Sequence, residues 1–112
     1  PVSGAFHTRF MAEAGKALRD AFADLALLPG GRGTIYSNVY ASSLPDALAT
    51  ESDPSLSAYL ERHMTRPVRW VEEIRAIHEN GAESFIEFGP GKVLTGLVGK
   101  ILPDVPAAKA FT

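Results

Sequence analysis

His7 is the residue of this chain best suited to act on a substrate, because it follows a predicted extended segment at residues 1–6. Functional groups of α/β proteins usually lie just past the ends of their strands. A histidine in that place can serve as a general base if a nucleophile lies within hydrogen-bonding distance and a second group orients its other ring nitrogen. The chain contains no Gly-x-Ser-x-Gly elbow, so the pattern lacks a nucleophile. A purely structural histidine is the alternative interpretation.

The other two histidines, His63 and His78, raise the question of a zinc site. The three histidines are widely separated, there is no His-Glu-x-x-His pair, and no carboxylate accompanies them at ligand spacing, so we expect no metal. His78 falls on the polar side of a predicted helix near its C-terminus, where a positive charge suits the helix dipole. We therefore expect the His78 side chain to be solvated.

A glycine-rich run at residues 89–92, Gly-Pro-Gly-Lys, precedes a predicted helix. Free N–H groups at the start of a helix can hold a phosphate. The run is shorter than the phosphate-binding pattern Gly-x-x-x-x-Gly-Lys-Ser/Thr, and a tight turn explains its glycines as well. We favour the turn, and we interpret the Gly-Gly-Arg-Gly cluster at residues 30–33 as a loop.

The rest of the chain is organised around a predicted strand, turn and helix at residues 84–101. Residues 84–88 are aromatic and β-branched and are bounded by glycines, as in an inner strand of an α/β sheet. Apolar residues then repeat at helical spacing, and Pro103 ends the run. The repeating residues are Val93, Leu94, Leu97, Val98 and Ile101.

Two further elements are predicted in the first 52 residues. Apolar residues from Phe10 to Leu25 form one stripe of an amphipathic helix that begins at Arg9, with Thr8 as its N-cap. Residues 34–40 are β-branched and aromatic, which predicts a strand that runs into a loop at residues 41–52.

Two helices are predicted between residues 53 and 81. The first starts with Asp53 as N-cap and Pro54 at the first helical position, and the second follows a break at residues 65–67 and ends at Gly81 as C-cap. Their inward-facing residues are Leu56, Tyr59, Leu60 and His63 in the first, and Trp70, Val71, Ile74 and Ile77 in the second. The resulting order, β-α-β-α-α-β-α, predicts an α/β fold with a three-layer α/β/α core around a parallel sheet. Both edges of a three-stranded sheet would be open unless other chain covers them.

The composition is that of a soluble globular protein, with 46% hydrophobic and 21% charged residues among 112. A net charge of −2 gives no long-range attraction to nucleic acid or to an anionic membrane, and no run of about 18 apolar residues could span a bilayer. The absence of cysteine excludes disulfides and a cysteine nucleophile, and it is compatible with the cytoplasmic location that we expect. The chain starts at Pro1 without a methionine or a signal peptide, which we interpret as a piece of a longer protein.

Four runs of residues resemble, in order and spacing, the C-terminal portion of the malonyl-CoA:acyl carrier protein transacylases, which also form the acyltransferase domains of fatty acid and polyketide synthases. The runs are Ser-Gly-Ala-Phe-His-Thr at residues 3–8, Ser-Asn-Val at 37–39, Pro-Val-Arg-Trp at 67–70 and Glu-Phe-Gly-Pro-Gly-Lys-Val-Leu-Thr-Gly-Leu at 87–97. The resemblance implies that residues 1–112 are a partial acyltransferase domain, the C-terminal segment of its large subdomain.

The resemblance also implies an acyl transfer through a serine and a histidine. The serine attacks malonyl-CoA to give a malonyl-enzyme, and the phosphopantetheine thiol of an acyl carrier protein then takes the malonyl group. His7 matches the catalytic histidine of the family, which deprotonates the serine and then the thiol. His63 stands where bacterial members have a glutamine whose main-chain carbonyl orients that histidine, so the His63 carbonyl is expected to orient His7. No bound cofactor and no metal are implied.

The four residues that end at the catalytic histidine correlate with the substrate in polyketide acyltransferases. His-Ala-Phe-His accompanies malonyl and Tyr-Ala-Ser-His accompanies methylmalonyl. The sequence here, Gly4-Ala5-Phe6-His7, is similar to the malonyl form apart from Gly4. Phe6 would narrow the pocket beside the α-carbon, so Ala5 and Phe6 are expected to contact the substrate and to select malonyl.

The resemblance places the other parts of the family's site before Pro1: the serine elbow, the arginine that binds the malonyl carboxylate, the oxyanion-hole donors and the small subdomain. We therefore expect this chain alone to be inactive and to need that N-terminal part as its partner. One alternative is a non-enzymatic α/β interaction module whose apolar faces pair with another chain. Another is a fragment of a serine hydrolase that uses His7 with water as the acceptor. The matching runs favour a free-standing enzyme over a synthase domain without deciding between them.

Overall fold

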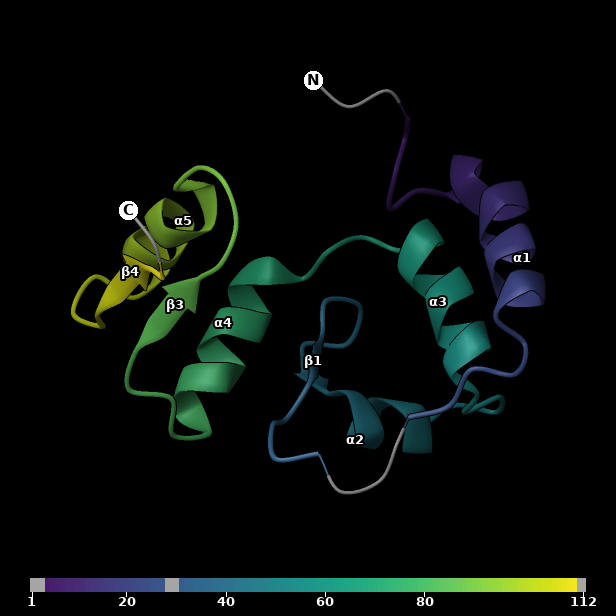
Figure 1. The fold of residues 1–112 in the computed structure, drawn as a ribbon, viewed down its shortest axis with the longest axis horizontal. Helices are drawn as coiled ribbons and strands as arrows, with labels where there is room; N and C mark the ends of the chain where they lie inside the picture. The colour runs from purple at the N-terminus through teal and green to yellow at the C-terminus, as the bar shows by residue number, and fades with distance from the viewer. Residues whose placement is uncertain (1–3, 28–30, 111–112) are drawn as a thin grey trace. The chain divides into compact units, whose positions relative to one another are not determined.

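The computed structural model describes residues 4–27 and 31–110. Its helices and strands, shown in Figure 1, form two compact units, Pro1–Arg69 and Trp70–Thr112. In the described part of the chain, no helix combines the length and the apolarity needed to cross a bilayer.

The segment that leads to His7 is a turn. Of the extended segment predicted at residues 1–6, residues 1–3 lie outside the described part of the chain, and Gly4 to Phe6 form a bend and the start of a turn. The strand prediction is therefore wrong for residues 4–6. A strand requires a paired neighbour, and no strand of the described residues pairs with this segment.

The first unit is built on the packing of two helices. A single 3₁₀ turn, η1 at Arg9–Met11, leads into α1 at Ala12–Ala21, and α1 packs along α3 at Leu56–Thr65. Gly15 is the buried residue of α1, and a methyl group there would lie only 3.2 Å from the carbonyl oxygen of Glu61 on α3. Arg19 then joins the two helices through ion pairs with Asp53 at 2.6 Å and with Glu61 at 3.0 Å. Glycine and arginine together fix how closely α1 approaches α3.

The predicted helix at residues 9–25 is confirmed at its start and is too long at its end. The Thr8 hydroxyl accepts a hydrogen bond from the Phe10 N–H at 3.3 Å, as expected of an N-cap. The helix ends at Ala21, and the next apolar residues lie outside the core: Phe22 and Leu25 are 44% and 43% exposed. Short helices depend on packing against a core for most of their stability.

The strand predicted at residues 34–40 is wrong in extent and in pairing. Only Tyr36–Ser37 form a strand, β1, which pairs antiparallel with β2 at Ser42–Ser43. The chain between them turns because the fully buried Ser37 hydroxyl accepts the N–H groups of Val39 and Tyr40. A serine hydroxyl that accepts nearby backbone N–H groups takes them away from hydrogen bonds between strands. The alternation of apolar and polar residues, from which strands are predicted, does not reveal such a bond.

The core of the first unit is a small apolar cluster beneath α3. It contains Val39, Leu44, Leu48 and Tyr59, with Leu44 and Leu48 supplied by the short helix α2 at Leu44–Ala49. Helix α3 starts two residues later than predicted, because Ser55 rather than Asp53 caps it by accepting the Ala58 N–H at 3.2 Å. The Asp53 carboxylate is engaged by the Ser55 N–H and by Arg19 instead.

The second unit is an α/β unit with a small parallel sheet, so the predicted fold class is confirmed. Helix α4 at Trp70–Glu79 is followed by β3 at Phe85–Glu87, α5 at Val93–Ile101 and β4 at Ala107–Lys109. Strands β3 and β4 are parallel, with Phe85 opposite Ala107, and α5 packs against both. The predicted helix from Val93 to Ile101 is confirmed, whereas β4 was not predicted. The strand predicted at residues 84–88 is present only at Phe85–Glu87, and its prediction as an inner strand is wrong, because among the described residues it pairs with β4 alone and Ile86 is 60% exposed.

The end of α4 forms a Schellman motif, which confirms Gly81 as its C-cap. The Gly81 N–H donates to the His78 carbonyl at 2.9 Å, the Ala82 N–H donates to the Ile77 carbonyl at 3.2 Å, and φ of Gly81 is +103°. The His78 ring is half-buried and its Nδ1 donates to the Ala82 carbonyl oxygen at 2.8 Å. The expectation of a solvated His78 is therefore wrong, because the ring is part of this cap.

Candidate active site at the end of helix α3

His7 is attached to the C-terminal turn of α3 by two hydrogen bonds. Its backbone N–H donates to the Met64 carbonyl at 3.0 Å, and its ring Nδ1 lies 2.9 Å from the His63 carbonyl oxygen. The last four carbonyls of an α-helix have no partner within the helix. The end of α3 therefore supplies a pair of acceptors that match the two donors of one histidine. The family resemblance implied this pairing, while the catalytic roles of His7 and His63 stay predictions.

The backbone of His7 lies in the left-handed region, with φ of +62°. Few residues other than glycine adopt this region, and such conformations persist where the surrounding structure holds them, often at functional sites. Here the turn is held on one side by the bond to Met64 and on the other by the Thr8 hydroxyl, which donates to the Ala5 carbonyl at 2.7 Å. In this conformation the backbone N–H and the ring Nδ1 of His7 can both form hydrogen bonds to α3.

The hydrogen bond to His63 fixes which ring nitrogen of His7 carries the proton. A carbonyl oxygen can only accept, so Nδ1 is the protonated nitrogen. In the neutral ring, Nε2 then keeps its lone pair and is free to take a proton from a nucleophile. This is the tautomer that a general base needs.

The His63 side chain lies beside the His7 ring. The ring centroids of His7 and His63 are 5.3 Å apart, and the angle between the ring planes is 88°. On α3, the ring centroid of Tyr59 lies 5.9 Å from that of His63. Burial lowers the pKa of His63, and the neighbouring His7 lowers it further. Both effects keep the His63 ring uncharged near neutral pH.

The two residues predicted to contact the substrate precede His7 on the same turn. Ala5 and Phe6 are exposed, and 47% of Phe6 is accessible. The structure thus places Ala5, Phe6, His7 and His63 at one end of α1 and α3, with the two aromatic groups of residues 6 and 7 adjacent in the chain.

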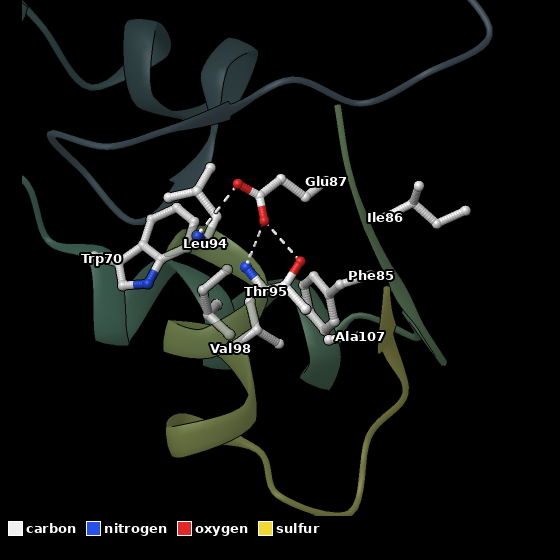
Figure 2. Close-up of a pocket in the computed structure, with 9 residues that line it drawn as sticks. Trp70, Phe85, Ile86, Glu87, Leu94, Thr95, Val98 and Ala107 are labelled. Atoms are coloured by element: carbon white, nitrogen blue, oxygen red, sulfur yellow. Dashed lines mark hydrogen bonds between the residues drawn. The ribbon is translucent and has the colours of Figure 1, made fainter. Parts of the chain in front are cut away.

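A second feature, at the start of α5, resembles an anion site and is already filled by the chain itself. The Glu87 carboxylate accepts the N–H groups of Leu94 at 3.3 Å and Thr95 at 2.8 Å and the Thr95 hydroxyl at 2.6 Å, as Figure 2 shows. The hydrogen bond from the Thr95 side chain is the main cause that lowers the pKa of Glu87. Because Glu87 occupies the N–H groups of Leu94 and Thr95, a phosphate bound at residues 89–92 would lie close to this carboxylate, which disfavours that interpretation. The tight-turn interpretation is confirmed by positive φ values at Gly89 and Gly91.

Glu87 was not recognised from the sequence as a cap. The available signal was an acidic residue directly before a glycine turn and a helix start, a place where negative charge is favoured.

A cavity of about 90 Å³ lies between α4, α5 and the sheet of the second unit (Figure 2). Its lining is mostly apolar and consists of Trp70, Ile74, Phe85, Ile86, Glu87, Leu94, Thr95, Val98 and Ala107. Among its polar groups, Glu87 and Thr95 are bonded to each other, and the indole nitrogen of Trp70 is buried without a hydrogen-bond partner among the described residues. The cavity offers no free nucleophile or base, so it is a packing feature of this unit. Across residues 4–27 and 31–110, no cluster of three or more potential metal ligands occurs.

Comparisons with known proteins find that nearly the whole chain is similar to part of several acyltransferases. It is 38% identical over 109 residues to a malonyl CoA-acyl carrier protein transacylase of Synechocystis, covering 93% of this chain and 33% of that protein. It is 34% identical over 112 residues to the polyketide biosynthesis protein ThaF of Burkholderia thailandensis, covering 96% of this chain and 9% of ThaF. No family model matches the chain.

Solved structures agree with these relatives. An acyl-carrier-protein S-malonyltransferase of Bartonella henselae superposes with a TM-score of 0.80 at 34% identity, covering 100% of this chain and 33% of that one. A malonyl CoA-acyl carrier protein transacylase of Clostridium perfringens superposes with a TM-score of 0.81 at 29% identity, covering 98% and 33%. The chain therefore spans about a third or less of the length of the proteins that it matches.

Proposed function

We propose that this chain, which is similar over nearly its whole length to malonyl CoA-acyl carrier protein transacylases, is the C-terminal part of an enzyme that transfers malonyl from CoA to an acyl carrier protein. The acceptor is the phosphopantetheine thiol of the carrier protein, and the reaction supplies fatty acid or polyketide biosynthesis. The observation that carries the proposal is the hydrogen bond from His7 Nδ1 to the His63 carbonyl oxygen, which leaves Nε2 unprotonated.

In the proposed first half-reaction, His7 Nε2 takes the proton from a serine hydroxyl that the remainder of the protein supplies. The serine oxygen bonds to the thioester carbonyl carbon of malonyl-CoA, the C–S bond breaks, and the CoA sulfur leaves with the proton from His7. The products are a malonyl-serine ester and CoA thiol. In the second half-reaction His7 deprotonates the carrier-protein thiol, which attacks the ester, and the proton returns to the serine oxygen.

The end of α3 has two tasks in this scheme. The His63 carbonyl keeps the His7 proton on Nδ1, so that the reactive lone pair stays on Nε2. The partial negative charge at the C-terminus of a helix also favours the positive charge that His7 gains during each proton transfer. A helix end thus replaces the buried aspartate that orients histidine in a three-residue triad.

The choice of malonyl is assigned to Ala5 and Phe6, which directly precede His7. Phe6 is the bulky residue of the pair, and it would leave no room for a methyl branch at the α-carbon of the substrate.

The proposal needs no cofactor or metal, and it assigns the protein to the cytoplasm. It also makes the isolated chain inactive, because the serine belongs to the other part of the enzyme.

The proposal is tested by replacing His7 with alanine in the complete protein that contains this chain. Transfer of malonyl from malonyl-CoA to the carrier protein should fall by about three orders of magnitude or more, since base and nucleophile act as a unit. His78→Ala is the matched control, because this histidine also bonds to a backbone carbonyl yet belongs to a helix cap. Near-normal transfer by the His7 variant would refute the proposed function.

A further inference from the structure

The His63 side chain contributes a second constraint on His7 that is separate from its main-chain carbonyl. We propose that the His63 imidazole is a positioning residue that fixes the plane of the His7 ring through an edge-to-face contact. This inference rests on the proposed function, in which the direction of His7 Nε2 determines the rate of proton transfer.

A hydrogen bond at Nδ1 alone does not fix the ring of His7. It holds one distance, Nδ1 to the His63 carbonyl oxygen at 2.9 Å, and coupled changes of χ1 and χ2 can keep that distance while they tilt the ring. The torsion that turns a histidine ring has a broad energy minimum, so packing must select one angle. The His63 ring stands against the His7 ring at 88° with centroids 5.3 Å apart, which blocks this rotation. The His63 carbonyl thus restrains the position of His7 Nδ1, and the His63 ring restrains the tilt of the His7 ring.

The His63 ring is itself held from the opposite side. Tyr59 lies one helical turn earlier on α3, where side chains four residues apart are neighbours, and its ring contacts His63 at 5.9 Å. Tyr59 is only 7% exposed and belongs to the apolar core of the first unit. A continuous row of side chains therefore connects His7 with the apolar core of this unit.

The hydrogen bonding of His63 indicates that its ring restrains His7 by steric contact and not by a hydrogen bond. Nδ1 of His63 is buried and has no hydrogen-bond partner among the described residues. Burial and the neighbouring His7 lower the pKa of His63, so the ring stays uncharged while His7 gains a proton. A flat ring without any ring nitrogen should therefore serve in this position as well as histidine does.

Three variants of the complete protein separate the ring from the carbonyl, because all three keep the main chain: His63→Ala, His63→Leu and His63→Phe. We expect the alanine and leucine variants to lower kcat about tenfold with KM for malonyl-CoA changed less than about twofold, since a displaced base slows chemistry without weakening binding. The phenylalanine variant should stay within about threefold of wild type, because it restores the flat surface. Thermal unfolding of each variant monitors the fold.

Equal kcat values in all three variants, or a loss in His63→Phe as large as in His63→Ala, would overturn the inference. If the alanine variant does not fold, the comparison of leucine with phenylalanine decides, because both fill the space and only one is flat. His7→Ala distinguishes this inference from the proposed function. Full transfer by His7→Ala refutes the function, whereas an inactive His7→Ala beside three fully active His63 variants refutes only the positioning role.

Discussion

The end of α3 and the start of α5 solve the same problem in opposite ways. Each helix terminus presents backbone groups that lack partners within the helix. At the start of α5 the Glu87 carboxylate accepts hydrogen bonds from the N–H groups of Leu94 and Thr95 and from the Thr95 hydroxyl, as Figure 2 shows. At the end of α3 the two carbonyls of His63 and Met64 are satisfied by a single residue, His7.

The difference lies in what is left over after the cap is made. Glu87, at the end of β3, uses both carboxylate oxygens to accept hydrogen bonds from the start of α5. His7 uses its backbone N–H and Nδ1, and one basic nitrogen, Nε2, remains. The end of α3 is therefore a candidate active site, because the residue that caps it keeps a basic nitrogen that takes no part in the cap.

The largest effect is expected from His7→Gln in the complete protein. Glutamine can still donate a hydrogen bond to the His63 carbonyl, yet it has no basic nitrogen, so the end of α3 would become as inert as the start of α5. We expect the melting temperature to change little and malonyl transfer to fall by about three to four orders of magnitude. Intact mass after mixing with malonyl-CoA should show one malonyl adduct on wild type and none on the variant at the same time. Adduct formation at an equal rate would contradict the account.

A smaller effect is expected when α1 is pushed away from α3 by Gly15→Val. A methyl group at residue 15 would already lie 3.2 Å from the Glu61 carbonyl oxygen, and valine adds more. Such overpacking costs about 1–3 kcal/mol in the free energy of unfolding, and it should slow transfer as well, because His7 precedes α1. Urea unfolding and transfer assays measure the two effects.

The control for this variant is Gly99→Ala on α5, where nothing lies within 4 Å of the added methyl group. Alanine is favoured over glycine in a helix by about 1 kcal/mol, so this variant should be neutral or slightly more stable. A Gly15→Val protein as stable and as active as wild type would show that close helix packing does not position His7.

The smallest effect is expected from Glu87→Gln, which should lower the melting temperature and leave the rate of transfer unchanged. The hydrogen bonds from Thr95 lower the pKa of Glu87 in the folded state, so the unfolded chain binds more protons in acid. This contribution to stability is therefore present above the ordinary pKa of glutamate, about 4.3, and is lost as pH falls through the lower folded value.

Melting curves of wild type and Glu87→Gln should differ most near neutral pH and converge in acid. A difference that grows as the pH falls would contradict the assigned cap.

Local signals in the sequence predicted the second unit well. The helix from Val93 to Ile101 follows from its apolar spacing, and the C-cap at Gly81 follows from the need for a positive φ. Strand β4 was missed because Ala107–Lys109 has little β propensity and becomes a strand only by pairing with β3. The Glu87 cap was missed for a similar reason, since it joins residues eight positions apart.

The candidate site depends on long-range contacts that no local pattern contains. His7 and His63 are 56 positions apart, and their hydrogen bond was expected only from the family resemblance. The segment before His7 was predicted as extended, whereas residues 4–6 form a bend and the start of a turn, and the strained backbone of His7 itself is held by its bonds to α3. The Ser37 turn replaced a predicted strand because a buried hydroxyl took the backbone donors.

The account depends most directly on the protonation of one ring, and ¹⁵N NMR of the complete protein with labelled histidine can observe it. At a pH where the His7 ring is neutral, the account predicts a proton on Nδ1 and a free lone pair on Nε2. A proton on Nε2, with Nδ1 bare, would contradict it, because the bond to the His63 carbonyl could not exist and the nitrogen assigned as base would be blocked.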